Sequence, residues 1–329
     1  MNRQQYFDRL QSLKKEDNFQ NLALKVFRFQ SKHNKVYSEF VMSLNIFPKK
    51  IKNIYEIPFL PVDIFRSHIV LTGDENYQRI FTSSGTTGEQ PSKHYIKDSF
   101  FYEQIFSKIF SSFYGNPSDY TILALLPSYL EREGSSLVYM MDKLIKESAS
   151  PDSGFYLHEL EKLYSLLKRL QEQKRKTLLF GVTFALLDFV SSFNLNFPEL
   201  IVMETGGMKG RRKEMIREEV HELLCHGFGV EVIHSEFGMT ELLSQAYSSG
   251  KGIFKSPPWL RILIRDPYDP LKPAGLKTSG GINIIDLANI DSCAFLSTQD
   301  LGKVYDDNSF EVLGRFDFSD VRGCNLMIE

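Results

Sequence analysis

The sequence predicts an α/β fold followed by a β-rich part, and two patterns carry this prediction. Between residues 79 and 234, short β-branched or apolar runs alternate with longer amphipathic stretches, as expected for strands joined by crossover helices. After Gly250, Pro and Gly turns separate short apolar runs, which is typical of an antiparallel sheet or a barrel. At 329 residues, the chain is long enough for two domains or one large one.

The expected elements can be read off in chain order. Residues 1–75 show apolar positions at helical spacing and are expected to form a helical opening. Residues 76–250 form the α/β part and residues 251–313 the β-rich part. Strands are expected at IFT, TILALL, TLLF, LIVMET, VEVIH, RILI, GINIID and CAFLST, with helices at residues 100–113, 135–147, 158–174 and 209–229 and after Gly181.

Composition excludes several classes of protein. The 39 Lys and Arg against 41 Asp and Glu give a formal charge of −2, so the chain lacks the basic excess that binds a nucleic-acid backbone. Three cysteines without a CxxC spacing argue against a disulfide framework or a structural zinc site and favour the cytoplasm. The longest apolar stretch, residues 178–190, falls short of the roughly 20 residues that span a bilayer. We therefore expect neither nucleic acid nor a membrane span.

The segment FTSSGTTGEQPSKHY, residues 81–95, has the composition of an anion-binding loop. A predicted strand leads into it, its two glycines let backbone amides turn inward, and Lys93 follows. The donors of the loop are Ser83, Ser84, Gly85, Thr86, Thr87 and Gly88. The P-loop pattern GxxxxGK[ST] fails, because no Lys follows a second glycine directly. A solvated Ser/Thr turn is the alternative, but four hydroxyls, two glycines and a lysine favour phosphate binding.

Further short segments follow downstream, and they are rich in glycine and polar residues. They are ETGG with Gly206 and Gly207, FGMTE at 237–241, STQDLG at 297–302 and GRFD at 314–317. Glu241 offers the carboxylate oxygen that Mg²⁺ prefers, and Asp300 offers two acceptors for a vicinal diol. Each segment alone would be read as a turn or a surface residue.

Together with the phosphate loop, these segments resemble the motifs of adenylate-forming enzymes, the superfamily of acyl-CoA synthetases and adenylation domains. The resemblance spans about residue 80 to the C-terminus. It implies the large N-terminal domain of that fold, with residues 1–313 as the core and residues 76–250 as its nucleotide-binding part. It also implies ATP and Mg²⁺ as cofactors.

The resemblance further implies a role for each matching residue. Gly206 and Gly207 let the adenine lie against the backbone, and Phe237 and Gly238 belong to the same nucleotide site. Thr240 contacts the α-phosphate and Glu241 holds Mg²⁺. The remaining roles are those of Asp300, which takes the ribose hydroxyls, Arg315, which reaches the nucleotide, and the loop of Ser83 to Gly88 with Lys93, which binds phosphate.

Within that superfamily, LLPSYLEREGSSLVYMMDKLI and the ending LGRFDFSDVRGCNLMIE resemble the acyl-protein synthetases, the long-chain-fatty-acid ligases of bacterial luminescence. Most adenylate-forming enzymes carry a small mobile domain of about a hundred residues after the Gly-Arg-x-Asp hinge. Here residues 314–329 are expected to be a hinge remnant and a tail, with that small domain missing. The resemblance implies that Cys324 accepts the acyl group, since thiolates attack activated acyl groups readily. A tail cysteine packed as a small hydrophobe is the alternative.

Three histidines could in principle belong to a metal site or to the nucleotide site. His221 and His226 in HELLCH are five residues apart rather than four, so a zinc-protease helix is not expected. His234 ends a predicted strand just before FGMTE. It either contacts the nucleotide or acyl carboxylate or is a core histidine bonded to backbone.

The resemblance thus implies an ATP-dependent acyl-protein synthetase, an acid-thiol ligase. It would activate a fatty acid as acyl-AMP, transfer the acyl group to Cys324 and deliver it to a partner reductase or acyl-carrier protein. One alternative is an acyl- or aryl-CoA ligase of the phenylacetate-activating type, which normally keeps the small domain. Another is a catalytically silent nucleotide-binding subunit, against which Thr240, Glu241, Asp300 and Arg315 argue.

Overall fold

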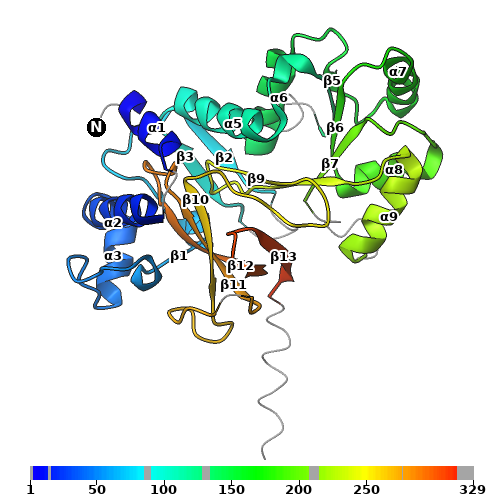
Figure 1. The fold of residues 1–329 in the computed structure, drawn as a ribbon. Coiled ribbons are helices and arrows are strands. Elements are labelled where there is room, and N and C mark those ends of the chain that lie inside the picture. Colours follow the sequence, from blue (N-terminus) through cyan, green and yellow to red (C-terminus); the bar gives the residue numbers. More distant parts are fainter. Residues whose placement is uncertain are drawn as a thin grey trace, which may run out of the picture.

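The computed structural model describes residues 3–13, 16–84, 90–127, 134–206, 215–275 and 277–316. Figure 1 shows two main sheets side by side, with helices packed around them. The predicted α/β fold with a β-rich part is confirmed. Among the helices in these ranges, none is both long and apolar enough to cross a membrane.

The first sheet has six strands in the order β5-β4-β6-β7-β8-β9. Its strands are β4 (Thr121–Leu125), β5 (Gly154–Phe155), β6 (Thr177–Val182), β7 (Ile201–Thr205), β8 (His234–Phe237) and β9 (Ala246–Ser248). All neighbours are parallel except β8 and β9. Every residue of β4 and β6 is buried, which explains why both read as continuous apolar runs in the sequence. The carboxyl ends of β6, β7 and β8 therefore meet at one edge.

One helix leads into β4, and the later ones connect the parallel strands, as the alternating pattern predicts. They are α5 (Ser99–Tyr114), α6 (Ser136–Ser148), α7 (Leu160–Glu172), α8 (Thr183–Ser192) and α9 (Arg217–Phe228). Asp98 caps α5 by accepting a hydrogen bond from the Phe101 backbone, and Ser135 caps α6 in the same way. Helix α9 ends at Gly229, whose positive φ of 68° stops the helix. Local capping chemistry thus fixes where several helices begin and end.

The second sheet is mostly antiparallel and carries the C-terminal part of the described chain. Its path is β1-β12-β11-β10, and β13 pairs with β12. The strands are β1 (Leu60–Pro61), β10 (Leu260–Arg265), β11 (Gly280–Asp286), β12 (Phe295–Val304) and β13 (Phe310–Arg315). One strand comes from the N-terminal region, since β1 runs parallel to β12. The helical opening is therefore tied into the β-rich part.

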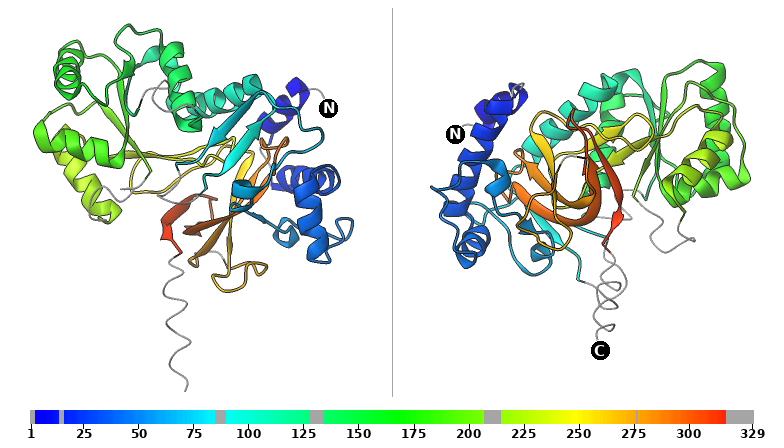
Figure 2. Two further views of the ribbon diagram at one scale, coloured as in Figure 1. Left: turned by 180° about the vertical axis from the view of Figure 1, so that it is seen from behind. Right: turned by 60° about the horizontal axis from the view of Figure 1, so that its bottom comes forward.

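Most of the remaining elements lie around the second sheet, whereas the short turn at residues 117–119 lies beside the helices of the first sheet. These elements are α1 (Arg3–Gln11), α2 (Glu16–His33), α3 (Lys35–Ser43), η1 (Ile54–Glu56), α4 (Ile64–Ser67), η2 (Pro117–Asp119) and the ribbon β2 (Arg79–Thr82) with β3 (Lys93–Ile96). Figures 1 and 2 show this β2–β3 ribbon running between α5 and the second sheet. The ribbon therefore lies where the two sheets meet.

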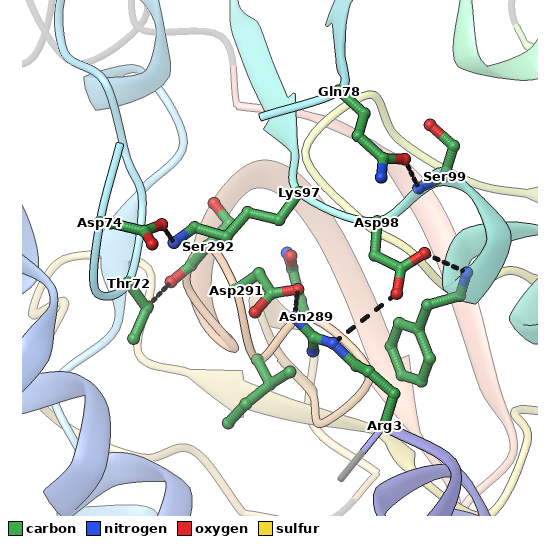
Figure 3. Close-up of polar contacts among 12 residues, drawn as sticks. Arg3, Thr72, Asp74, Gln78, Lys97, Asp98, Ser99, Asn289, Asp291 and Ser292 are labelled. Atoms are coloured by element: carbon green, nitrogen blue, oxygen red, sulfur yellow. Dashed lines mark hydrogen bonds and ion pairs between the residues drawn. The ribbon is translucent and has the colours of Figure 1, made fainter. Parts of the chain in front are cut away.

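An ion-pair cluster fastens the N-terminal helix to this junction, as Figure 3 shows. Arg3 pairs with Asp291, in the turn between β11 and β12, and approaches Asp98 at 3.8 Å. On the same turn, the Ser292 carbonyl accepts a hydrogen bond of 2.6 Å from Thr72. The β11–β12 turn is thus held from several directions.

One predicted strand is shifted along the chain. The apolar run VEVIH predicts a strand over residues 230–234, but β8 covers His234–Phe237. The parallel register with β7, in which Met203 pairs with His234 and Thr205 with Glu236, decides these bounds. His234 therefore begins the strand instead of ending it, and its ring lies 3.1 Å from the Tyr114 hydroxyl.

Candidate active site

The two ends of the predicted phosphate loop are hydrogen-bonded to each other. The Ser83 backbone donates to the Ser92 carbonyl at 3.1 Å, and the Ser92 backbone donates to the Ser83 hydroxyl at 2.9 Å. Ser84 is exposed, as is Lys93 at the start of β3 opposite Thr82. The loop residues Gly85, Thr86, Thr87 and Gly88 lie outside the described residues.

The segment FGMTE begins at the carboxyl end of β8. Phe237 ends the strand and packs edge-on against Phe254 and Phe310, with ring centroids 6.0 and 5.4 Å away. At position 238 a Cβ would lie 2.4 Å from the Glu236 carboxylate, so glycine is the residue that fits there. The strand end and the glycine together place Thr240 and Glu241 in the turn beyond the sheet edge.

Glu241 is a buried carboxylate beside the strand that leaves the phosphate loop. Only 6% of the residue is exposed. Burial raises the pKa of Glu241, while a hydrogen bond from the Ser92 side chain, one within Glu241 itself and the charge of Arg66 oppose that shift. A single carboxylate at this position suits Mg²⁺, which is commonly bound through one or two carboxylates plus substrate phosphates. The described residues contain no group of three or more His, Cys, Asp or Glu side chains that could hold a metal ion by themselves.

Two buried side chains hold the backbone of Thr240 and Glu241. His94 Nδ1 lies 2.7 Å from the Thr240 carbonyl, and Asn289 donates a 2.8 Å hydrogen bond to the Glu241 carbonyl. His94 Nε2 lies 3.2 Å from the Asn289 side-chain oxygen. Burial lowers the pKa of His94 to about 4, so the ring is neutral at pH 7. Sequence reasoning missed both residues.

Gly206, at the end of β7, lies beside this segment. Thr205 pairs in register with Glu236, so the following residues, Gly206 and Phe237, are neighbours at the sheet edge. Gly206 adopts a positive φ of 69°, and its carbonyl accepts a hydrogen bond from the Thr183 hydroxyl. Gly207 lies outside the described residues.

A second pair of acidic residues lies just before the sheet edge. Burial raises the pKa of Glu236 to about 7, although Thr205 donates a hydrogen bond to its carboxylate. Burial tends to raise the pKa of Glu204 as well. Hydrogen bonds from the His221 ring and the Thr183 hydroxyl more than offset this effect, so the pKa of Glu204 is lowered. His221 thus faces Glu204, at 3.5 Å. Glu236 is another site neighbour that no sequence motif indicated.

Asp300 and Arg315 form the other half of the candidate site. They pair across β12 and β13, and Arg315 Nε lies 3.3 Å from Asp300 Oδ1. Burial raises the pKa of Asp300, and the charges of Arg315 and Arg265 oppose this shift. The Arg315 side chain is 75% exposed, whereas Arg265 is buried and donates hydrogen bonds to the Ile282 and Thr298 carbonyls.

Hydrogen bonds and longer-range charges relate the two halves. Gln299, next to Asp300, donates a 2.6 Å hydrogen bond to Asp63. Asp63 in turn pairs with Arg66 at 3.3 Å, and both charges act on the Glu241 carboxylate. The structure therefore brings Ser83, Thr240, Glu241 and Asp300 into one region at the junction of the sheets. Cys324 lies outside the described residues.

Comparisons with known proteins agree with this architecture. No protein-family model matches the sequence, and a search of curated proteins finds no match. Among solved structures, an open form of 2-hydroxyisobutyryl-CoA ligase with 2-HIB-AMP and CoA is similar. The TM-score is 0.67 at 12% sequence identity, over 92% of this chain and 70% of that one. The same ligase in its postadenylation state with R3-HIB-AMP gives a TM-score of 0.68 at 12% identity, over 93% and 69% of the chains.

ATP-bound MatB from Rhodopseudomonas palustris is similar over a shorter stretch. It aligns with a TM-score of 0.53 and 17% identity over 72% of this chain and 47% of its own. The chain thus spans about half the length of MatB. At these identities the likeness is one of fold, and the protein shares the fold of these solved structures.

Proposed function

We propose that this protein is an ATP-dependent acyl-protein synthetase that activates a fatty acid as acyl-AMP and transfers the acyl group to Cys324. One observation carries the first half of the proposal. The buried Glu241 carboxylate is hydrogen-bonded by Ser92, at the exit of the Ser/Thr-rich loop, and lies within the electrostatic influence of Asp63, which accepts a hydrogen bond from Gln299 next to Asp300. A nucleotide needs phosphate, metal and ribose contacts in one place, and these residues can provide them.

In the first half-reaction, the fatty-acid carboxylate attacks the α-phosphorus of ATP and pyrophosphate leaves. Asp300 accepts hydrogen bonds from the ribose hydroxyls and so fixes the nucleotide. The Thr240 hydroxyl donates to the α-phosphate, and Lys93 with the Ser/Thr loop binds the leaving phosphates. Fixed donors of this kind stabilise charge that develops in the transition state.

Glu241 is the residue that would hold Mg²⁺. When bound, Mg²⁺ neutralises phosphate charge and polarises the phosphoryl oxygens. Burial raises the pKa of Glu241 despite the charge of Arg66, and a bound cation would favour the ionised form of the carboxylate. The contribution of the chain is to present one ionised oxygen at a fixed place beside Thr240.

In the second half-reaction, the thiolate of Cys324 attacks the acyl carbonyl carbon. The bond to the phosphate oxygen breaks, AMP leaves, and the thiol proton goes to solvent. Phe316 donates a backbone hydrogen bond to Gln299, next to Asp300, and Cys324 is eight residues further along the chain. At full extension those residues reach about 28 Å, which keeps the thiol within range of the nucleotide site. A reductase or acyl-carrier protein is the proposed acceptor of the thioester.

Intact mass after incubation with ATP, Mg²⁺ and a panel of fatty acids tests the proposal. The wild type should gain one acyl mass that hydroxylamine removes. Cys324→Ala should lose this acylation while keeping acid-dependent pyrophosphate exchange, because the two half-reactions use different residues. Cys225→Ala is the matched control and should acylate normally.

Two results would contradict the proposal in different ways. An acyl mass on Cys225 or Cys293 in the Cys324→Ala variant would remove the tail cysteine from the mechanism. The 2-hydroxyisobutyryl-CoA ligase likeness favours one alternative, an acyl-CoA ligase. Formation of acyl-CoA from added coenzyme A, with no protein acylation, would establish that alternative.

A further inference from the structure

We infer that His94 and Asn289 are positioning residues that hold the peptide of Thr240 and Glu241 against the strand leaving the phosphate loop. The inference rests on the proposed function, because it assigns these two side chains a role in that site. Neither residue needs to touch substrate. Each acts through the backbone of the segment that carries the proposed phosphate and metal contacts.

The first observation is that His94 bonds backbone rather than filling space. Its Nδ1 lies 2.7 Å from the Thr240 carbonyl, which can only accept, so Nδ1 carries the ring proton. A neutral imidazole has a single N–H, so the 3.2 Å contact of Nε2 with the Asn289 oxygen is not a second hydrogen bond from the ring. The bond to Thr240 is therefore the one that a substitution must preserve.

The second observation is that Asn289 binds the next carbonyl along the chain. Its amide nitrogen donates to the Glu241 carbonyl at 2.8 Å, which fixes the side-chain oxygen toward His94. Consecutive carbonyls, those of Thr240 and Glu241, are thus bound by two side chains that also face each other. Such an arrangement leaves the peptide little freedom to rotate.

The third observation is that both supports are themselves rigid. His94 belongs to β3 and pairs in register with Phe81 of β2, and 1% of the residue is exposed. Asn289 is fully buried in the β11–β12 turn, where Gln30 of α2 donates to its carbonyl at 3.0 Å. Figure 3 shows Asn289 on the turn that also carries Asp291 and Ser292, and Arg3 reaching Asp291.

These contacts connect three parts of the chain at the peptide that matters for catalysis. His94 is 146 residues from Thr240 and 195 from Asn289 in sequence. Ser92, on the same exit strand, binds the Glu241 carboxylate itself. The phosphate loop and the Thr240–Glu241 peptide are therefore held in register with each other, and a misplacement of about 1 Å at such a site can cost on the order of 100-fold in rate.

Three substitutions at position 94 separate positioning from packing. In His94→Asn the amide nitrogen can occupy the place of Nδ1 and still donate to Thr240. His94→Gln places its amide near Nε2 instead, and His94→Leu keeps the volume without any donor. We expect acid-dependent pyrophosphate exchange to keep a kcat within about three-fold of wild type for Asn and to fall about 30-fold or more for Gln and Leu. The KM for the fatty acid should stay unchanged in all three.

A matched control and a double mutant complete the test. His226→Gln changes an exposed histidine on α9 and should leave both stability and kcat unchanged. His94→Leu combined with Asn289→Leu should cost less than the product of the two single effects, because both act on one peptide. Equal kcat losses for His94→Asn and His94→Leu, or independent effects in the double mutant, would overturn the inference.

Failure of the proposed function gives a different result. If the wild type shows no acid-dependent exchange, the proposed activity is wrong, and the variants are compared instead by their affinity for MgATP. The inference then expects His94→Leu and His94→Gln to bind MgATP at least about five-fold more weakly than His94→Asn. Identical affinities, or no MgATP binding by the wild type, would overturn it.

Discussion

The turn after β8 presents a buried carboxylate and the β12–β13 hairpin a partly buried one, and the two are held in different ways. Burial raises the pKa of both Glu241 and Asp300. Glu241 is held by Ser92 at its carboxylate and by Asn289 at its carbonyl, which come from distant parts of the chain. Asp300 faces its partner on the neighbouring strand, Arg315, whose side chain is 75% exposed.

This difference suits Glu241 to a role that needs precise positioning and Asp300 to a role in binding. Groups that stabilise a transition state must keep a fixed place, whereas a ribose contact tolerates a looser one. An exposed ion pair contributes little to stability, so the hairpin register, rather than the Arg315 charge, places Asp300. We therefore expect the turn to control the rate of adenylation and the hairpin to control affinity for ATP.

The largest expected effect concerns Glu241. Glu241→Ala removes the proposed Mg²⁺ ligand, so acid-dependent pyrophosphate exchange should fall about 1,000-fold with the fold retained. Exchange kinetics and far-ultraviolet circular dichroism measure the two parts of this prediction. Glu147→Gln, an exposed carboxylate on α6 that accepts from Ser107, is the control and should behave as wild type. If Glu241→Ala retained pyrophosphate exchange, the turn that carries Glu241 would have no role in adenylation.

A second prediction concerns Glu236, which lies directly before the turn. Its pKa is raised from 4.5 to about 7 in the folded protein, so the native state binds more protons than the unfolded state between these pH values. Stability from this group is therefore present below pH 4.5 and lost as the pH rises through 7. As the pH rises from 4.5 to above 7, the free energy of unfolding of Glu236→Gln should increase by roughly 3 kcal/mol relative to wild type. Urea unfolding at several pH values measures this difference.

Glu204, on the neighbouring strand β7, is expected to make stability depend on pH in the opposite direction. The pKa of Glu204 is lowered in the folded protein. Its contribution to stability is therefore present above the pKa of the unfolded state and is lost as the pH falls through the pKa of the folded state. Glu204→Gln should therefore lose stability at pH 7. The same pH response in both variants would show that the two carboxylates do not differ as the structure indicates.

The smallest expected effect concerns the hairpin. Asp300→Ala should raise the dissociation constant for ATP ten- to one hundred-fold, roughly 1.5 to 3 kcal/mol, with less change in kcat. Isothermal titration with MgATP and exchange kinetics measure both. Arg315→Gln is the matched variant, and because its side chain is mostly exposed, the change should be about five-fold or less. If Asp300→Ala lowered kcat more than it lowered the affinity for ATP, Asp300 would control the rate of adenylation, as is expected for the turn.

The sequence by itself determined the order of the elements and the segments that carry chemistry. Buried strands such as β4 and β6 are contiguous apolar runs, and caps such as Asp98 and Ser135 act within one turn of their own helix. Such signals are local, so they can be read without knowing what the segment packs against. The site roles given to Glu241, Asp300 and Cys324 stay predictions.

Only the tertiary structure decided which side chains hold those segments in place. The shift of β8 to His234–Phe237 follows from its register with β7, and no apolar periodicity marks it. His94 and Asn289 read as ordinary polar residues, yet they meet at the Thr240–Glu241 peptide from positions 195 residues apart. Contacts between distant segments depend on how sheets and turns pack, and spacing along one chain does not encode them.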